Sequence, residues 1–529
     1  MFVEVFHMAI PRSPSFVLTL ELDSHPGLFS AADKELEILR VIYNTVLGNY
    51  LKLENQMKRL KEYKRWIRQL HGIKGKLAFD EENPFLQNEL ECVRERLKDL
   101  REQYQLTEYA SHAWVKGIRK HFGDKVNAAF AQKTASRAWL TFRKKLFGKA
   151  KKVVFLRKGE MASFEGKTNK TGWRYHNKHL VYKDMSTPLK WTGHDSYVSE
   201  ILSHLEKKTP FTYTIQKNGE AQTINDFYHV KYVRIVREII RGKVRFFADL
   251  IIAGYPSSKG RKLGKGRIGL DIGTATLAVS SLKKVALYNL AEDVKILARE
   301  IKLAQRRMDR SRRAMNPGNY HENGTIKKGR KEWQLSNRYQ KQQARVRELN
   351  RRQAAIRKLA HQGLANSLLP LGDAFFIETM NFKALQKRAK ETKVSEKTGK
   401  YARKKRFGKT IGHRAPSMFV SILEQKVKSL GGIFKRVNTQ TFKASQYCHV
   451  RNDFFKKPLS ERWHVIEDET KIQRDLYSAF LLMNADSSGT KAKRKACMET
   501  FRRFKSLHDQ EINTIIKEER RILNSGILL

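Results

Sequence analysis

Three acidic residues stand in segments that otherwise consist of apolar side chains suited to burial. Asp271 lies inside one such stretch, Glu378 ends a second, and Asp475 opens the apolar face of a third. A carboxylate in a buried segment is costly unless it is paired or bound to a metal ion. One such acid alone usually caps an element or pairs with a base. Three in series favour a shared site.

The chemistry of such a site follows from its oxygen ligands. Carboxylates suit Mg²⁺ or Mn²⁺, and two ions about 3.5–4 Å apart can activate water and stabilise the leaving oxygen of a phosphodiester. Gly273 and Thr274 permit a tight turn after Asp271, which leaves room for a phosphate. We therefore expect Asp271, Glu378 and Asp475 to be metal ligands and catalytic residues of a nuclease.

Secondary-structure patterns indicate how these acids are positioned. A strand, turn and strand are expected over 267–280, with further strands at 374–380 and 433–437, and a helix at 472–484. Parallel or antiparallel pairing of these strands would form one sheet that carries two of the acids. The helix would bring the third acid to it.

A basic insertion separates the first two acids. Two helical arms, 292–314 and 330–362, are expected to form an antiparallel hairpin, and 383–409 is expected to be a basic, mobile loop. Arginine binds phosphate bidentately, and acids that could pair along the arms are scarce, which favours phosphate contact over a solvated helix face. The predicted nucleic-acid contacts are Arg306, Arg307, Arg310, Arg312, Arg313, Arg345, Arg347, Arg351, Arg352 and Arg474.

The whole chain shares this positive charge. Its 529 residues include 106 Lys and Arg against 53 Asp and Glu, a formal net charge of +53. A charge of this size favours a polyanion as partner, and nucleic acid is the natural one. A membrane surface is the weaker candidate because the basic residues spread over the whole length. Hydrophobic residues make up 40 %, enough for several folded domains.

The predicted secondary structure changes twice in the N-terminal half. A strand at 15–23 is followed by a charged helical region that reaches about 147, and then by a β-rich region and a Gly/Ser/Lys linker at 255–266. Helix breaks are expected at His71–Gly72, Asn83–Pro84 and Gly123. The predicted strands of the β-rich region are 153–156, 180–182, 211–215, 230–236 and 244–252.

The motifs around the three acids resemble those of the transposon-encoded TnpB family, relatives of the type V CRISPR effectors. Gly269-Leu-Asp-Ile-Gly-Thr274 is similar to the first RuvC motif, and Phe376-Ile-Glu-Thr-Met-Asn381 to the second. Arg474-Asp475, followed by Ser478-Ala479, is similar to the third. The resemblance covers most of the chain, is strong from about 266 to 485, and rests on pattern alone before that.

The resemblance implies a multidomain α+β protein with an RNase H-like (RuvC) α/β nuclease core, a β-barrel wedge domain and a helical recognition domain. It implies RNA-guided cleavage of double-stranded DNA, with a guide RNA as partner and Mg²⁺ or Mn²⁺ as cofactor. The implied domains are 1–30 (first wedge strand), 31–150 (helical recognition), 151–265 (wedge), 266–485 (nuclease, with the hairpin at 292–362) and 486–529 (basic helical tail).

One segment departs from the family pattern. The family usually carries a zinc ribbon of two Cys-x-x-Cys pairs, whereas 441–470 retains Cys448 alone, with His449 and His464 nearby. A structural zinc site needs four ligands at short spacing, so we predict no structural zinc. Packing of aromatic side chains would hold the segment instead: Phe454, Phe455 and Trp463.

Three other functions are compatible with the same sequence features. A guided DNA-binding protein that has lost cleavage, a type V CRISPR-like effector, and a transposase that joins DNA are the alternatives. Retention of all three acids favours cleavage, and the basic hairpin favours the nuclease branch. Three cysteines, no expected signal peptide and no expected membrane span indicate a cytoplasmic, nucleoid-associated protein. The oligomeric state is left open.

Overall fold

The computed structural model describes residues 13–527, except 81, 192, 218–219, 389–390, 392–393, 395–406, 457, 459–460 and 467–469. The chain divides into two compact units, Met1–Ser257 and Ser258–Leu529. The division falls within the stretch that the sequence marks as a linker. None of the helices in the described residues is both long and apolar enough to cross a membrane.

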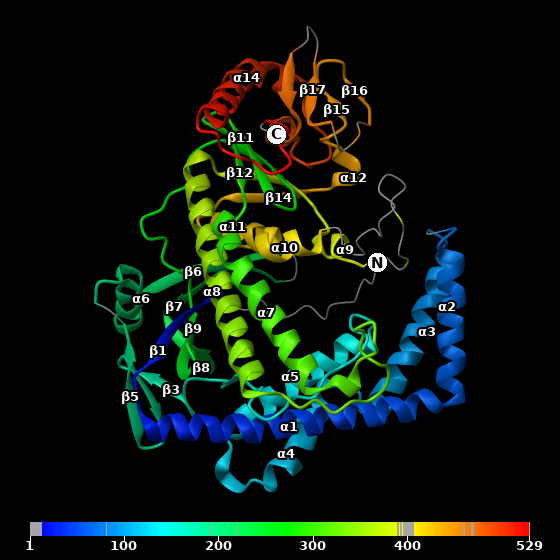
Figure 1. The fold of residues 1–529 in the computed structure, drawn as a ribbon, viewed down its shortest axis with the longest axis vertical. Helices are drawn as coiled ribbons and strands as arrows, with labels where there is room; N and C mark the ends of the chain where they lie inside the picture. Colours follow the sequence, from blue (N-terminus) through cyan, green and yellow to red (C-terminus); the bar gives the residue numbers. More distant parts are fainter. Residues whose placement is uncertain are drawn as a thin grey trace. The chain divides into compact units, whose positions relative to one another are not determined.

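Five helices form the first part of unit 1: α1 (Pro26–Arg59), α2 (Lys61–Leu77), α3 (Pro84–Gln103), α4 (Glu108–Lys120) and α5 (Ala128–Leu146). In Figure 1, α1 is the long dark-blue helix, and α2 and α3 stand side by side at its far end. Asn83 accepts a hydrogen bond from the Leu86 amide (3.1 Å) and precedes Pro84, so the break predicted there is confirmed.

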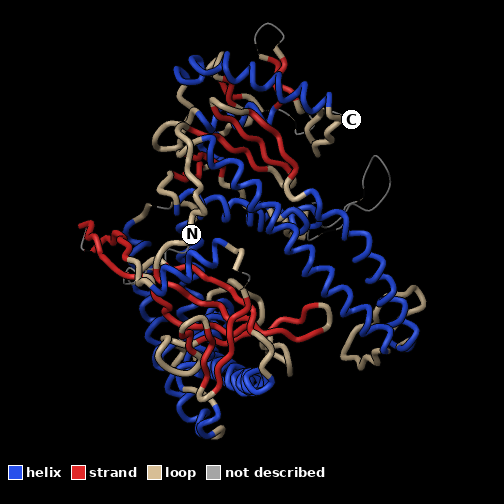
Figure 2. The backbone as a smooth tube through the Cα atoms, turned by 90° about the vertical axis from the view of Figure 1, so that its left-hand side faces the viewer, coloured by secondary structure: helices blue, strands red, loops and turns tan. Residues whose placement is uncertain are grey.

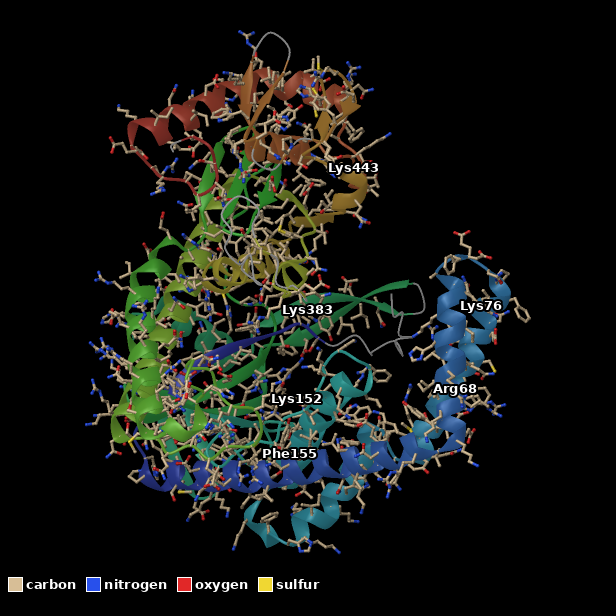
Figure 3. All side chains as sticks on the ribbon, turned by 45° about the vertical axis from the view of Figure 1, so that its right-hand side comes forward. Arg68, Lys76, Lys152, Phe155, Lys383 and Lys443 are labelled. Atoms are coloured by element: carbon tan, nitrogen blue, oxygen red, sulfur yellow. The ribbon has the colours of Figure 1, made fainter. Side chains whose placement is uncertain are left out.

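The break predicted at His71–Gly72 is wrong, because α2 runs through both residues. A glycine inside a helix costs only about 1 kcal/mol, and α2 packs apolar side chains against α3. Ile73 is its one fully buried residue among those described, and basic side chains such as Arg68 and Lys76 project from the helix (Figure 3).

The strands of unit 1 pair in the order β2-β8-β9-β1-β5-β4-β3. β1 lies between β9 and β5 and is antiparallel to both, so the first strand joins the β-rich region as predicted. No ladder joins the described strands β2 and β3, and the sheet is open where a closed barrel was expected. The bounds are β1 (Ser15–Leu22), β2 (Ser163–Glu165), β3 (Arg174–His176), β4 (His179–Tyr182), β5 (Met185–Lys190), β8 (His229–Ile240) and β9 (Lys243–Ala253). β6 (Pro210–Lys217) and β7 (Glu220–Phe227) form a separate hairpin, and α6 spans Ser196–Glu206.

The strand predicted at 153–156 is also wrong. Asn44 of α1 accepts a hydrogen bond from the Leu156 amide (2.9 Å) and donates one to its carbonyl (2.8 Å). Side chains of α1 thus satisfy backbone groups that a neighbouring strand would otherwise pair. Phe155 of this segment is 46 % exposed (Figure 3).

Unit 2 is built around a five-stranded sheet of order β12-β11-β10-β13-β14. The first three strands in sequence are antiparallel, whereas β13 lies parallel to β10 and β14 parallel to β13. The predicted strands at 267–280, 374–380 and 433–437 are therefore present. Their bounds are β10 (Arg267–Ile272), β11 (Thr276–Ser281), β12 (Val285–Asn289), β13 (Ala374–Glu378) and β14 (Ile433–Val437).

Helices cover both faces of this sheet (Figure 2). α13 (Arg474–Met483) and α14 (Arg494–Lys517) share one apolar core with Ala278, Leu287 and Phe376. α8 (Asn337–Leu368) and α11 (Pro416–Ser429) share the opposite core with Ile268, Leu270 and Ile377. Side chains of a strand alternate between faces, so each strand contributes to both cores. The remaining short helices are α9 (Phe382–Leu385), α10 (Gly408–Arg414) and α12 (Thr439–Phe442).

The basic hairpin is present as α7 (Lys295–Met315) and α8. Glu300 pairs with Arg345 (3.2 Å), and the hydroxyls of Ser311 and Ser336 are hydrogen-bonded (2.7 Å), which confirms the antiparallel arrangement. The second helix begins at Asn337, later than the predicted 330, because Asn316 holds the preceding chain extended by hydrogen bonds to both backbone groups of Gln334. Most of the predicted loop at 383–409 lies outside the described residues.

The segment at 441–470 forms two small hairpins, β15 (Tyr447–Cys448) with β16 (Asp453–Phe454), and β17 (Trp463–Val465) with β18 (Lys471–Gln473). Phe454 packs on Tyr447 (centroids 4.9 Å apart), and the Trp463 indole donates to the Gly526 carbonyl (2.9 Å). The buried centre is His449, which the sequence marks only as a candidate zinc ligand. Its imidazole bonds the Tyr477 hydroxyl (2.7 Å), and burial lowers its pKa to about 4.

Packing around His449 leads to a prediction about zinc. We expect less than one zinc ion per ten purified chains by elemental analysis. We also expect a zinc-selective chelator, added with Mg²⁺ kept in excess, to leave the melting temperature unchanged, since aromatic packing such as that of Phe454 on Tyr447 would hold the segment without a metal. One zinc per chain, together with a fall in melting temperature on chelation, would show that the prediction is wrong.

Candidate active site

The parallel pairing of β10 and β13 places the first two acids side by side. Leu270 pairs with Ile377, so Asp271 and Glu378 occupy the next positions at the carboxyl ends of the two strands. Adjacent strands lie roughly 4.8 Å apart, and paired residues point to the same face. Asp271 and Glu378 therefore share one face and one edge of the sheet.

The third acid arrives on a helix that touches the sheet backbone. Gly269 lies two residues before Asp271, on the same face, and a Cβ there would stand 1.9 Å from the Ala479 carbonyl oxygen and 2.3 Å from the Met483 amide. Only glycine allows this approach of α13 to β10. Because Asp475 lies one turn before Ala479, the contact sets its distance from the end of β10.

Arg267 fixes the other end of the same helix. Its guanidinium donates to the carbonyls of Met483 (2.8 Å) and Ala485, and lies 4.2 Å from the centroid of the Phe376 ring. Cations are favourable at a helix C-terminus, where carbonyls lack partners. The helix therefore runs antiparallel to β10, from Asp475 near Asp271 to Met483 near Arg267.

Electrostatics link Asp271 to the other two carboxylates. Burial raises the pKa of Asp271 well above its ordinary value, and the negative charges of Asp475 and Glu378 raise it further, against the opposing charge of Arg474. The Asp271 residue as a whole is half-buried, but protein atoms closely surround its carboxylate. This enclosure is the main reason why its pKa is raised. Three acids this close favour either protonation or a bound cation.

The other two acids are held by specific hydrogen bonds. Burial raises the pKa of Glu378, and a hydrogen bond from the Ala444 amide opposes the rise. Burial also raises the pKa of Asp475, opposed by the charge of Arg462 and by a hydrogen bond from Gln473. These bonds orient the carboxylates, and no pattern in the sequence pointed to Ala444 or Gln473.

One oxygen of the set lacks any partner. Glu378 Oε1 is buried and accepts no hydrogen bond in the described part of the chain. Such an oxygen is costly unless something satisfies it, and a hard divalent cation suits a carboxylate oxygen. The donor set therefore fits Mg²⁺ or Mn²⁺ in chemistry. Its geometry does not yet converge, because no group of three or more His, Cys, Asp or Glu in the described residues is arranged to hold a metal ion.

Space for a substrate lies directly after Glu378. A pocket of about 500 Å³ is lined by residues from Thr379 to Lys383, with Gln386 and Ser417. A smaller cavity of about 110 Å³ borders Glu378 and Arg436. Lys383 lies at the start of the basic segment (Figure 3) and supplies a positive charge at the larger opening. A phosphodiester could reach the carboxylate edge from this side.

The predicted role of Arg474 needs correction. Its side chain is buried (8 % exposed), and its guanidinium donates to the carbonyls of Pro458 (3.0 Å) and Glu461 (3.4 Å). A buried guanidinium with these partners cannot bind a nucleic-acid phosphate without leaving them. The structure instead places its charge where it opposes the rise in the pKa of Asp271.

The other predicted arginines lie on α7 and α8, and they fall into two groups. Acids pair with several of them, more than the sequence suggested: Asp309 with Arg312 and Arg313, Glu300 with Arg345, and Glu348 with Arg351. Arg347 donates to Gln343 (3.2 Å). Within the described residues the exposed arginines of this set without an ion pair are Arg306, Arg307, Arg310, Arg347 and Arg352.

Known proteins show no match to this chain by sequence and only distant matches by structure. No protein-family model matches the chain, and no curated protein does. Among solved structures, a Cas12f1–sgRNA–target DNA complex is similar with 13 % identity and a TM-score of 0.38, covering 89 % of this chain and 99 % of that one. A CRISPR–Cas12f ternary complex has 13 % identity and a TM-score of 0.23, covering 90 % and 100 %. TM-scores below 0.5 do not establish a common fold.

Neutralising Asp271 should stabilise the fold. The folded state favours the protonated form of Asp271. The stability that this form contributes is fully present below the ordinary pKa of an aspartate and is lost as pH rises through the raised pKa of the folded protein. At pH 7 and without divalent ions, Asp271→Asn should therefore raise the free energy of unfolding by about 1 kcal/mol or more, and the melting temperature by roughly 2–4 °C. The gain should vanish in acid.

Asp486→Asn is the matched control. Burial tends to raise the pKa of Asp486. Hydrogen bonds from Ser488 and Thr490 outweigh burial and hold that pKa well below its ordinary value. The same substitution there should lower the melting temperature. Calorimetry of both variants decides the matter, and an Asp271→Asn protein no more stable than the parent would contradict the account of a strained carboxylate cluster.

Gly269→Ala tests the contact that positions α13. The added methyl meets backbone atoms that cannot rotate away, so we expect a loss of several kcal/mol and early melting of unit 2. Gly363→Ala in α8 meets nothing within 4 Å and is the control. It should be neutral or stabilising by up to about 1 kcal/mol. Equal melting temperatures for the two variants would exclude this packing.

Proposed function

We propose that this chain is an RNA-guided DNA endonuclease that hydrolyses phosphodiester bonds with metal ions held by Asp271, Glu378 and Asp475. The observation that supports the proposal is the rise in the pKa of Asp271 caused by burial and by the charges of Asp475 and Glu378, together with the unpartnered Glu378 Oε1. Like charges buried close together, with strongly shifted pKa values, are typical of functional sites.

The sheet supports an RNase H-like, RuvC-type core. In such a core three antiparallel strands are followed by two strands that add in parallel beside the first, which is the order of β12-β11-β10-β13-β14. Acids at the carboxyl ends of the first and fourth strands, and on a later helix, are what the resemblance to the TnpB motifs implies. The topology thus agrees with the motifs that suggested the family.

The chain's own residues would prepare the site as follows. Bound Mg²⁺ or Mn²⁺ would supply a more acidic water and neutralise charge on the phosphate. Asp271 and Glu378 would be held in place by the sheet, and Asp475 by the contact of α13 with Gly269. Side-chain rotation of the carboxylates would complete their convergence. Arg474 would keep part of the negative charge balanced between turnovers.

Guide RNA and double-stranded DNA are proposed as partners from the charge and the motifs. A net charge of +53 calls for a polyanion. The exposed, unpaired arginines of α7 and α8 offer contacts to backbone phosphates. In a guided enzyme, base pairing reads the sequence while the protein holds the duplex by its shape.

A second candidate is a guided DNA-binding protein that does not cut. The observation that favours it is the lack, among the described residues, of three side chains already arranged around a common ion. Retention of the unpartnered Glu378 Oε1 argues for the nuclease. An assay of DNA cleavage distinguishes the nuclease from the binding protein.

The deciding experiment uses the full-length protein purified with its bound RNA. That RNA is sequenced, and plasmids carrying the matching target beside randomised flanks are incubated with Mg²⁺. We expect cleavage that Asp271→Ala reduces by on the order of 10³-fold while RNA binding is unchanged. Target binding without cleavage at every flank would support the second candidate, and cleavage by Asp271→Ala at the parent rate would remove Asp271 from the site.

A further inference from the structure

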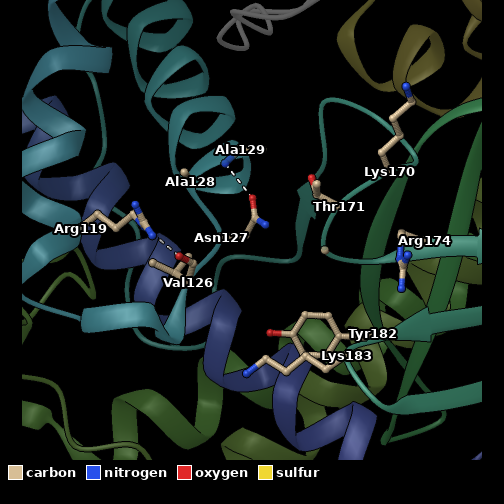
Figure 4. A pocket seen from close by; sticks show the side chains of 11 residues that line it. Arg119, Val126, Asn127, Ala128, Ala129, Lys170, Thr171, Arg174, Tyr182 and Lys183 are labelled. Carbon is tan, nitrogen blue, oxygen red and sulfur yellow. Dashed lines mark hydrogen bonds between the residues drawn. The ribbon is translucent and has the colours of Figure 1, made fainter.

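A second pocket, in unit 1, has a lining suited to a strongly negative ligand. It has a volume of about 630 Å³ and lies among α5, the loop before β3 and the turn after β4. Its charged lining residues are Arg119, Lys170, Arg174 and Lys183, and none of the described residues that line it is acidic. Figure 4 shows these side chains spread around the opening.

Three of these cations lack an ion pair in the described part of the chain, although Lys183 lies over the Tyr182 ring (5.7 Å from its centroid) and its charge acts on the buried Glu35. Lys170, Arg174 and Lys183 make no ion pair within the described residues, whereas acids elsewhere in unit 1 pair with many of its basic side chains. Lys170 and Lys183 are exposed, and Arg174 is half-buried. Unpaired cations around one concavity repel one another, so a ligand that neutralises them binds favourably.

The walls of the pocket are fixed before any ligand arrives. Tyr182 stacks on Trp173 (centroids 4.5 Å apart), and its hydroxyl donates to the buried Glu35 (2.9 Å). Gly172 has φ +73°, and a Cβ there would meet the Phe130 ring at 2.5 Å, so the loop lies tightly on α5. A preformed pocket loses little entropy when it binds.

Hydrogen-bonding groups add to the charge. Arg119 donates from Nε to the Val126 carbonyl (3.0 Å), which holds its guanidinium at the wall. Thr171 places a hydroxyl on the opposite side (Figure 4). Guanidinium, ammonium and hydroxyl groups together form the donor set that binds phosphate oxygens.

We propose that this pocket binds the terminal phosphate of a nucleic-acid strand. Its volume lies in the range of small-molecule pockets, roughly 300–1,000 Å³, and suits the end of a strand and not a continuous duplex. Four surrounding cations exceed what a singly charged phosphodiester within a strand requires, whereas a terminal monophosphate carries a charge of about −1.5 to −2 at pH 7. The inference rests on the proposed function for its nucleic-acid partner, but it is independent of the carboxylate site.

The test compares strands that differ only at their ends. Full-length Asp271→Ala protein, freed of co-purifying RNA, is titrated at elevated salt with labelled single strands bearing a 5′-phosphate, a 3′-phosphate or hydroxyls only. Elevated salt suppresses the general attraction of the basic surface. We expect one phosphorylated end to bind about tenfold tighter than the hydroxyl strand, as about two charge-assisted hydrogen bonds would give.

A pair of double variants locates the effect. Lys170→Ala with Lys183→Ala should abolish the preference for the phosphorylated end. Lys207→Ala with Lys243→Ala removes the same charge from exposed positions of unit 1 outside the pocket and should keep it. Equal binding of all three strands by the parent protein, or an unchanged preference in the pocket variant, would overturn the proposal.

Free ligands separate the two sources of a phosphate. Adenosine monophosphate and inorganic phosphate should compete only at concentrations far above that of the phosphorylated strand. Competition by the mononucleotide at the same concentration as the strand would assign the pocket to a free nucleotide and contradict the strand-end assignment. Cleavage by protein with an intact carboxylate site is scored separately, so failure here leaves the nuclease proposal standing.

Discussion

The close contact between Gly269 of β10 and the backbone of α13 is the constraint on which the candidate site depends. It lets a helix lie directly on a strand, and Arg267 secures the helix end that lies farther from the acids. Through this contact Asp475, which lies 204 residues after Asp271 in the sequence, is brought close to Asp271. Any side chain larger than hydrogen at Gly269 would separate the helix from the sheet.

The same packing creates an electrostatic cost. Asp271, Glu378 and Asp475 lie beside the apolar core that α13 shares with the sheet, and each has a raised pKa. A fold selected for stability alone would avoid this arrangement. Divalent cations would convert mutual repulsion into shared attraction, so the cost in the free protein and the proposed chemistry have one physical origin.

Short-range patterns were sufficient for much of this architecture. The strands that carry Asp271 and Glu378, and the basic hairpin between them, follow from apolar alternation and helical period. Failures occurred where side chains replaced backbone partners, as Asn44 does for Leu156, and where tertiary packing outweighed a glycine, as at Gly72. The burial of Arg474 could not be foreseen, because its partners are carbonyls whose positions only the folded loop defines.

Metal binding tests the central claim most directly. Electron paramagnetic resonance of the RNA-free protein titrated with Mn²⁺ reports both the number of bound ions and their separation. The account predicts two ions per chain with the spin coupling of a close pair, and loss of that coupled signal in Asp271→Ala. Binding of Mn²⁺ that Asp271→Ala leaves unchanged, or no coupled pair at saturation, would contradict a shared site of the three carboxylates.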